Sequence, residues 1–319
     1  MSVDPLATTQ PGVRVLAPGI GATFYGSLPR DLDTPLGREV IRACDLVTLH
    51  TAADAGDVQS AALVRQLGCE RVWLAIPANY LSRMDLRRGR AAVLDEVCRV
   101  AGVAASMGAE VLELNGEGAS DGATEGDWTH ARADGRERAR LEGLARDVFV
   151  TLREALPCSI ALAWTSHDMP AFRVPWGPIL SRVDLHAPQH YPAMPGVVAT
   201  QRTLDRRIAT SRGRWEALVA RGEIPEDVAP YGARWSPYLQ GHGHSVGALV
   251  WGLCEAPVAR LWACPGSWSA EALPALTVAR QIRAEVGHGP DAIARWQAAH
   301  GLTADGIAGP LTLAAMGLA

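Results

Sequence analysis

A file of polar side chains interrupts an otherwise apolar segment at residues 110–120, which reads EVLELNGEGAS. Glu113, Asn115 and Glu117 occupy every second position, so in a β-strand they share one face. Burial of such a file is costly unless its groups are hydrogen-bonded or carry out chemistry. A buried carboxyl suits general acid catalysis, because burial and a like-charged neighbour raise its pKa. The segment therefore predicts a functional site in which Glu113, by its like charge, raises the pKa of Glu117.

The elements that position this file form a repeating pattern. Eight apolar runs are separated by helical stretches whose apolar residues recur at three- and four-residue spacing. The runs begin at residues 13, 46, 71, 110, 159, 183, 228 and 259. Strand, loop and helix repeated eight times in roughly 250 residues is typical of a (β/α)8 TIM barrel, an α/β fold. A doubly wound open sheet is the alternative, but no G-x-G-x-x-G turn follows the first run.

A barrel of this kind, expected over residues 1–287, carries its active site at the carboxyl ends of the strands. The residues at those ends are polar or aromatic, and they predict a substrate-binding mouth. They are Tyr25, His50, Asn79, Tyr80, Asn115, Glu117, Trp164, His167, Asp168, His186, Gln189, Tyr191, Arg234, Trp235 and Trp268. Packing between strands and helices is the alternative role for Trp164, Trp235 and Trp268. Asp168 and Asp121 are candidates for a second catalytic carboxylate beside Glu117.

Two short motifs resemble family 18 glycoside hydrolases, the chitinase-like barrels. The spacing Glu110-x-x-Glu113-x-Asn115-x-Glu117 is similar to their D-x-x-D-x-D-x-E, although only the last residue is identical. The resemblance implies that Glu117 protonates the glycosidic oxygen and that Asn115 replaces the Asp that holds the substrate's N-acetyl group. The run PQHYP resembles the Gln-x-Tyr of plant-type members, which implies that Gln189 and Tyr191 contact the acetamido group and the reacting ring. RLWACPGSW similarly offers Trp262 or Trp268 as an aromatic floor.

The C-terminal residues 288–319 resemble the repeat of peptidoglycan-binding domains on cell-wall hydrolases. The matching positions, in order, are Trp296-Gln297, Gly301-Leu302, Asp305-Gly306-Ile307, Gly309-Pro310 and Thr312. The resemblance implies a wall-binding role for Trp296, Gln297 and Asp305. Complete domains carry two such half-repeats, and about thirty residues can hardly fold alone, so we expect the segment to pack on the barrel. A helical hairpin that only caps the barrel is the alternative.

Composition excludes several classes of protein. The 319 residues are 48% hydrophobic and 20% charged with a net charge of −4, and the basic residues are scattered, so we expect no nucleic-acid partner. The six cysteines form no C-x-x-C pair, which favours reduced core residues over a zinc ribbon. No cofactor is expected. Neither a signal peptide nor a membrane span is evident, which predicts cytoplasmic synthesis.

These observations together predict a peptidoglycan hydrolase, similar to a phage endolysin, that acts on the wall after release or delivery by a pore or a phage particle. No carboxylate is found on the run from residue 228, where many retaining barrel glycosidases carry their nucleophile. An N-acetylated sugar can supply its own nucleophile, so a single acid can suffice. Two alternatives stay open. One is a metal-dependent amidase that uses the strand-end histidines, and the other is a non-catalytic wall-binding or virion component.

Overall fold

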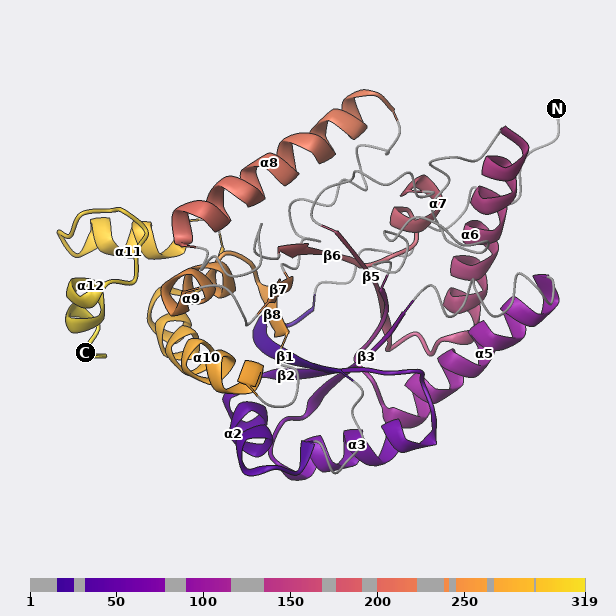
Figure 1. The fold of residues 1–319 in the computed structure, drawn as a ribbon, viewed down its shortest axis with the longest axis horizontal. Coiled ribbons are helices and arrows are strands. Elements are labelled where there is room, and N and C mark those ends of the chain that lie inside the picture. Colours follow the sequence, from indigo (N-terminus) through magenta and orange to yellow (C-terminus); the bar gives the residue numbers. More distant parts are fainter. Residues whose placement is uncertain are drawn as a thin grey trace.

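The fold is a closed barrel of eight parallel strands in the order β1 to β8, with β8 pairing back to β1. The computed structural model describes residues 16–25, 32–77, 90–115, 135–167, 176–190, 200–222, 238–240, 245–262, 267–289 and 291–318. Figure 1 shows the barrel with helices packed around it. The predicted (β/α)8 barrel is therefore confirmed.

The strands and helices alternate along the chain until the barrel is complete. The strands are β1 (Gly19–Tyr25), β2 (Leu46–His50), β3 (Arg71–Pro77), β4 (Val111–Asn115), β5 (Ala161–His167), β6 (Leu185–His190), β7 (Tyr238–Gln240) and β8 (Val258–Trp262). The described helices are α2 (Pro35–Ala43), α3 (Ala55–Gln66), α5 (Arg90–Met107), α6 (Gly135–Ala155), α7 (Trp176–Leu180), α8 (Gln201–Ala220), α9 (Val246–Cys254), α10 (Ser267–Val286), α11 (Ala292–Ala299) and α12 (Pro310–Ala315).

The first strand differs from the sequence prediction. It is GIGATFY at 19–25 and not the run from residue 13. Its glycines fit it to this place, because a Cβ on Gly21 would lie 2.3 Å from the carbonyl oxygen of Leu46 on β2. The close approach of two strands therefore explains a glycine-rich sequence that otherwise resembles a loop. The seventh predicted run begins at residue 228, outside the described residues, and β7 follows it.

The two faces of the sheet separate two apolar clusters. Inside the barrel, Leu46, Trp73 and Val111 pack with small residues of β5. Outside it, Leu112 and Leu114 join the large cluster beneath the helices. In the β4–β5 register Glu113 pairs with Ala163 and Asn115 with Thr165, so these polar residues share the inner face. The predicted inward direction of Glu113 and Asn115 is confirmed.

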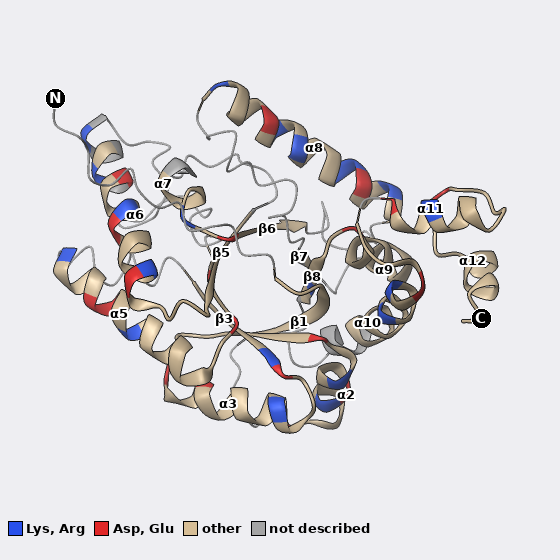
Figure 2. Cartoon of the chain, turned by 180° about the vertical axis from the view of Figure 1, so that it is seen from behind, with Lys and Arg blue, Asp and Glu red and all other residues tan. Residues whose placement is uncertain are grey.

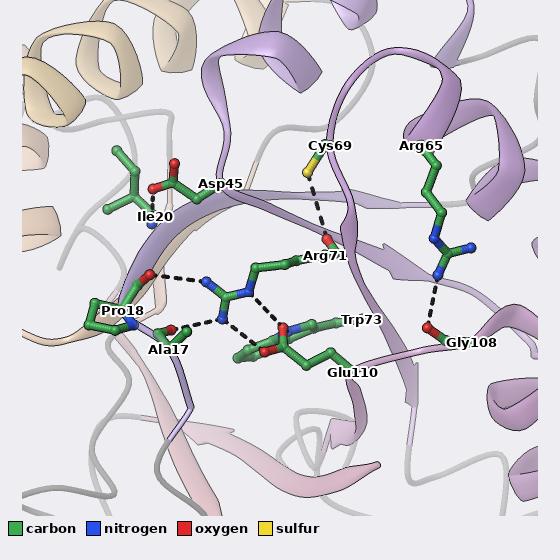
Figure 3. A network of polar contacts seen from close by, with 10 residues as sticks. All are labelled: Ala17, Pro18, Ile20, Asp45, Arg65, Cys69, Arg71, Trp73, Gly108 and Glu110. Atoms are coloured by element: carbon green, nitrogen blue, oxygen red, sulfur yellow. Dashed lines mark hydrogen bonds and ion pairs between the residues drawn. The ribbon is translucent and has the colours of Figure 1, made fainter. Parts of the chain in front are cut away.

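The amino end of the barrel is closed by a polar network around Arg71 (Figure 3). Its guanidinium donates to Glu110 at 2.9 and 3.1 Å and to the carbonyl oxygens of Ala17 and Pro18 at 2.8 and 3.1 Å. Trp73 adds a bond from Nε1 to Glu110 Oε2 at 2.9 Å. Glu110, the first residue of the four-residue motif, therefore holds the barrel together at the end opposite the expected mouth.

The C-terminal helices α11 and α12 pack on the barrel, as expected for so short a segment. Ile293 of α11 belongs to the main core cluster. The backbone N–H of Gly289 donates to the carbonyl of Cys254 at 2.9 Å, which ties the segment to the end of α9. Figure 1 shows both helices beside α8, α9 and α10.

The cysteines are free where the structure describes them. Cys44, Cys69 and Cys254 are buried, as predicted, whereas Cys98 and Cys158 are exposed, so the prediction of core residues is wrong for those two. Across the described residues, no helix is both long and apolar enough to cross a bilayer.

Candidate active site at the carboxyl end of the barrel

Three side chains from alternate strands meet at the carboxyl end of the barrel. Asn115, the last residue of β4, donates from Nδ2 to Nε2 of His50, the last residue of β2, at 3.1 Å. Gln189 of β6 donates from Nε2 to Asn115 Oδ1 at 3.4 Å. All three residues are buried. Since an amide nitrogen only donates, His50 accepts at Nε2, which requires a neutral ring. The structure thus brings together Asn115 and Gln189, two of the predicted site residues.

One layer deeper, Glu113 forms a buried ion pair that the sequence analysis missed. Arg260 of β8 places its Nη2 2.5 Å from Glu113 Oε2, and the side chains are 0% and 1% exposed. The guanidinium also lies 4.5 Å from the centroid of the Trp73 ring and donates to Thr48 Oγ1 at 3.3 Å. The positive charge offsets the charge of Glu113. The expected like-charge effect of Glu113 on Glu117 is therefore weakened by a cation that the prediction did not include.

Arg260 could have been noticed from the sequence. It interrupts the apolar run VARLWA and lies two residues from Val258 and Trp262, on the inner face of β8 by alternation. A buried charge needs a partner of the opposite sign. Its pairing with Glu113 depended on bringing β4 and β8 together across the barrel, which local pattern does not specify.

The same surroundings keep His50 neutral. Burial, with a smaller contribution from the positive charge of Arg260, lowers the pKa of His50 to about 4. Near neutral pH the ring is therefore an uncharged hydrogen-bond acceptor for Asn115. The predicted strand-end position of His50 is confirmed. Within the described residues, no three His, Cys, Asp or Glu side chains gather as metal ligands would.

We expect the stability of the barrel to fall as the pH drops from about 6.5 to about 4. The pKa of His50 is about 4 when folded, against roughly 6.5 when unfolded. Between these pH values His50 binds a proton in the unfolded chain but not in the folded chain. The free energy of unfolding therefore falls by about 3 kcal/mol by pH 4. Urea unfolding at pH 7 and pH 4.5 measures the loss. His50→Gln keeps an acceptor without a titrating ring, so it should remove most of this extra loss, and an unchanged pH dependence would contradict the assignment.

Two predicted substrate-binding residues point away from the barrel interior. Trp164 is fully buried in the outer cluster and meets Phe149 of α6 edge-on, with ring centroids 5.8 Å apart. His186 lies 2.9 Å from Ser166 Oγ through Nε2 and meets Trp215 of α8 edge-on at 4.8 Å. Both predictions are wrong, because each residue has the parity of the outer face. Residues on one face of a strand are an even number of positions apart, and His186 is three positions from the inward Gln189. Strand alternation would therefore have excluded His186 from the mouth.

Of the other predicted site residues, the structure describes the positions of only some. Tyr25 ends β1 opposite His50 in the register, and Trp268 lies in the first turn of α10. Asn115 ends β4, so Glu117 follows two residues later along the chain. Glu117, Asp168, Tyr191 and Trp235 themselves lie outside the described residues. The same is true of Asn79, Tyr80, Asp121 and Arg234.

The C-terminal segment is organised around Gln297, which is buried. Its Nε2 lies 2.9 Å from Asp305 Oδ1, 3.0 Å from the carbonyl oxygen of Ile307 and 2.9 Å from Thr312 Oγ1. Its Oε1 accepts from the N–H of Gly306 at 2.8 Å, and Gly306 has the positive φ of 70° expected for the Asp-Gly turn. Gln297 therefore holds the turn from inside, and its predicted part in wall binding would act through the shape of that turn.

The residues that this segment exposes are different ones. Trp296 is largely buried, stacks on His300 at 3.9 Å and bonds to Glu285 of α10 at 3.4 Å. Ile307 and Leu311, in contrast, are 48% and 80% exposed. Asp305 also accepts from the N–H of Ile307 at 2.9 Å. The polar residues of the matched motif thus build the turn, whereas the apolar residues Ile307 and Leu311 face solvent.

We expect Gln297→Leu to loosen residues 303–313 and to leave the barrel intact. The substitution removes the side-chain partner of the Gly306 N–H and of three acceptors, at a cost of about 3 kcal/mol. Hydrogen exchange followed by mass spectrometry should show faster exchange in this segment alone. Gln281→Leu, at an exposed position of α10, is the matched control and should leave exchange unchanged. Equal protection in both variants would contradict the role of Gln297.

The C-terminal segment that packs on the barrel matches a known family. Residues 291–316 match the family described as a putative peptidoglycan binding domain. This comparison agrees with the resemblance found in the C-terminal sequence. No curated protein sequence matches the chain.

Solved structures with some likeness to the chain include a spore cortex-lytic enzyme and two chitinases. The Bacillus cereus spore cortex-lytic enzyme SleL is 10% identical with a TM-score of 0.43, over 70% of this chain and 51% of that one. A GH18 chitinase from Pseudoalteromonas aurantia is 12% identical with a TM-score of 0.46, over 80% and 100% of the two chains. A family GH18 chitinase from Chromobacterium violaceum is 13% identical with a TM-score of 0.48, over 84% and 83%. The chain thus spans about half the length of SleL.

Proposed function

We propose that this protein is a peptidoglycan hydrolase that cleaves glycosidic bonds between N-acetylated sugars, with Glu117 as the general acid. The observation that carries the proposal is the combination of two features in one chain. A peptidoglycan-binding match covers residues 291–316. The barrel on which it packs has a buried polar cluster of His50, Asn115 and Gln189 at the carboxyl end of β4, where the chain continues to Glu117.

The proposed chemistry needs one acid and the substrate's own acetamido group. Glu117 donates its proton to the glycosidic oxygen as the bond to the anomeric carbon breaks. The acetamido oxygen attacks that carbon, and water then opens the cyclic intermediate and returns a proton to Glu117. In this proposal Asn115, Gln189 and Tyr191 orient the acetamido group. An inverting reaction, with Asp168 as the base that activates water, is the alternative within the same proposal.

A raised pKa of Glu117 would then come from burial more than from the charge of Glu113. Because Arg260 is paired with Glu113, we expect that carboxylate to contribute little repulsion to Glu117. Desolvation by the aromatic residues of the mouth is the remaining cause that raises a carboxyl pKa. A general acid needs this shift to stay protonated near neutral pH.

Asn115 favours one second candidate, a wall-binding protein without catalysis. The family 18 resemblance places an Asp at this position, and an amide cannot carry the charge of a carboxylate. In this candidate the barrel mouth binds glycan strands and leaves them intact. Binding to peptidoglycan without any new chain ends would identify it.

The experiment that tests the proposal is digestion of purified peptidoglycan, with the new ends reduced by borohydride and identified by mass spectrometry. Reduced muramic acid indicates a muramidase, and reduced glucosamine indicates a glucosaminidase. Free stem peptides with no reducing ends would overturn the glycosidase and identify an amidase. Chelator and added zinc in parallel digests distinguish metal-dependent hydrolysis from the proposed acid catalysis.

A further inference from the structure

The outer surface of α8 carries a straight ridge of basic side chains. Arg202, Arg206, Thr210 and Arg214 follow one another at four-residue spacing, and all four are exposed. Such residues lie one above another on a helix, about 6 Å apart. Arg stands at every basic position of the chain, which contains no Lys. Figure 2 shows blue basic segments along α8, with red acidic segments between them.

The opposite face of α8 fixes the direction of this ridge. Leu204, Ile208 and Trp215 are buried against the barrel. Trp215 also meets His186 of β6 edge-on at 4.8 Å. A helix held by this apolar face cannot rotate its Arg residues toward the core, so the ridge presents a fixed row of positive charge to solvent.

The ridge begins next to the segment that matches the peptidoglycan-binding family. Gln201, the first residue of α8, donates from Nε2 to the carbonyl oxygen of Gly306 at 3.1 Å. Gly306 belongs to the turn that Gln297 holds, and the exposed Ile307 follows it directly. Figures 1 and 2 agree in placing the same end of α8 beside α11. The row of Arg residues therefore continues the surface of the C-terminal segment.

We propose that α8 and the C-terminal segment form one wall-facing surface, on which Arg202, Arg206 and Arg214 bind phosphodiester groups of an anionic polymer attached to the wall. A guanidinium matches a phosphate with two parallel hydrogen bonds, which an ammonium cannot do. A row of cations suits a linear polyanion better than a single small anion. The whole chain has a net charge of −4, so it is this row of Arg residues, and not the overall charge, that would attract a polyanion. The inference rests on the proposed action on the wall.

The test compares binding of the full chain to two preparations of the same purified walls. One preparation keeps its phosphodiester polymers, and in the other they are removed with hydrofluoric acid. We expect Arg202→Ala/Arg206→Ala to bind the intact walls about tenfold more weakly, and added salt to reduce parent binding steeply. The matched control is Arg42→Ala/Arg146→Ala, which removes two exposed Arg residues from α2 and α6 and should bind like the parent.

The outcomes test the proposed α8 surface and the proposed glycosidase separately. Equal binding of the α8 variant and the parent to intact walls would overturn the surface, as would equally tight parent binding to stripped walls. Competition by duplex DNA as strong as that by a soluble polyol phosphate would show a general affinity for polyanions and would also overturn it. Digestion of the stripped peptidoglycan tests the glycosidase separately, because the α8 variant should release reducing ends there at the parent rate.

Discussion

Glu117→Gln should reduce the release of new reducing ends from peptidoglycan by about 10²- to 10⁴-fold, the usual contribution of a general acid. The amide keeps the size of the side chain but has no proton to give to the glycosidic oxygen. The midpoint of thermal unfolding should change little. Binding to intact walls should also persist, because the substitution changes neither residues 291–316 nor the Arg residues of α8.

The control for this variant is Glu39→Gln, which changes an exposed carboxylate on α2 in the same way. It should digest peptidoglycan at the parent rate. Full activity in Glu117→Gln would remove the general acid from the proposal. If neither the parent nor the variants release ends from any wall, while all of them bind, the non-catalytic candidate replaces the hydrolase.

Sequence pattern was sufficient for the barrel and for the faces of its fourth strand. The repeat of apolar runs and amphipathic helices follows from burying one side of every element, so it is visible locally. Alternation in EVLELN assigned Glu113 and Asn115 to the interior, where the structure places them. The position of Gln189 near Asn115 followed from the rule that strand ends meet at one end of a barrel.

The errors have a shared physical cause. Trp164 and His186 lie at strand ends, but proximity to the mouth does not decide which face a side chain takes. Gln297 matched a family motif, but its side chain holds a turn from inside. In each case the residue type suggested binding, whereas strand parity or local hydrogen bonding decided its direction.

The pairing of Glu113 with Arg260 is the least predictable feature of the site and gives the largest expected effect on stability. We expect Glu113→Gln to lower the free energy of unfolding by about 3–5 kcal/mol, because Arg260 would keep a charge in the barrel interior without a carboxylate. Arg260→Met should cost a similar amount by leaving Glu113 unpaired. For a domain of this size the loss corresponds to a fall of about 10 °C in the melting temperature.

The double variant Glu113→Gln/Arg260→Met decides whether the ion pair is the cause. If it is, the double variant should be more stable than either single variant, since it buries no unpaired charge. Losses that simply add would show that the two residues act independently. Activity of the double variant then separates two roles for Glu113. Activity restored with stability would mean that Glu113 serves the fold through Arg260, whereas a stable but inactive double variant would mean that the inner carboxylate also acts on the substrate or on Glu117.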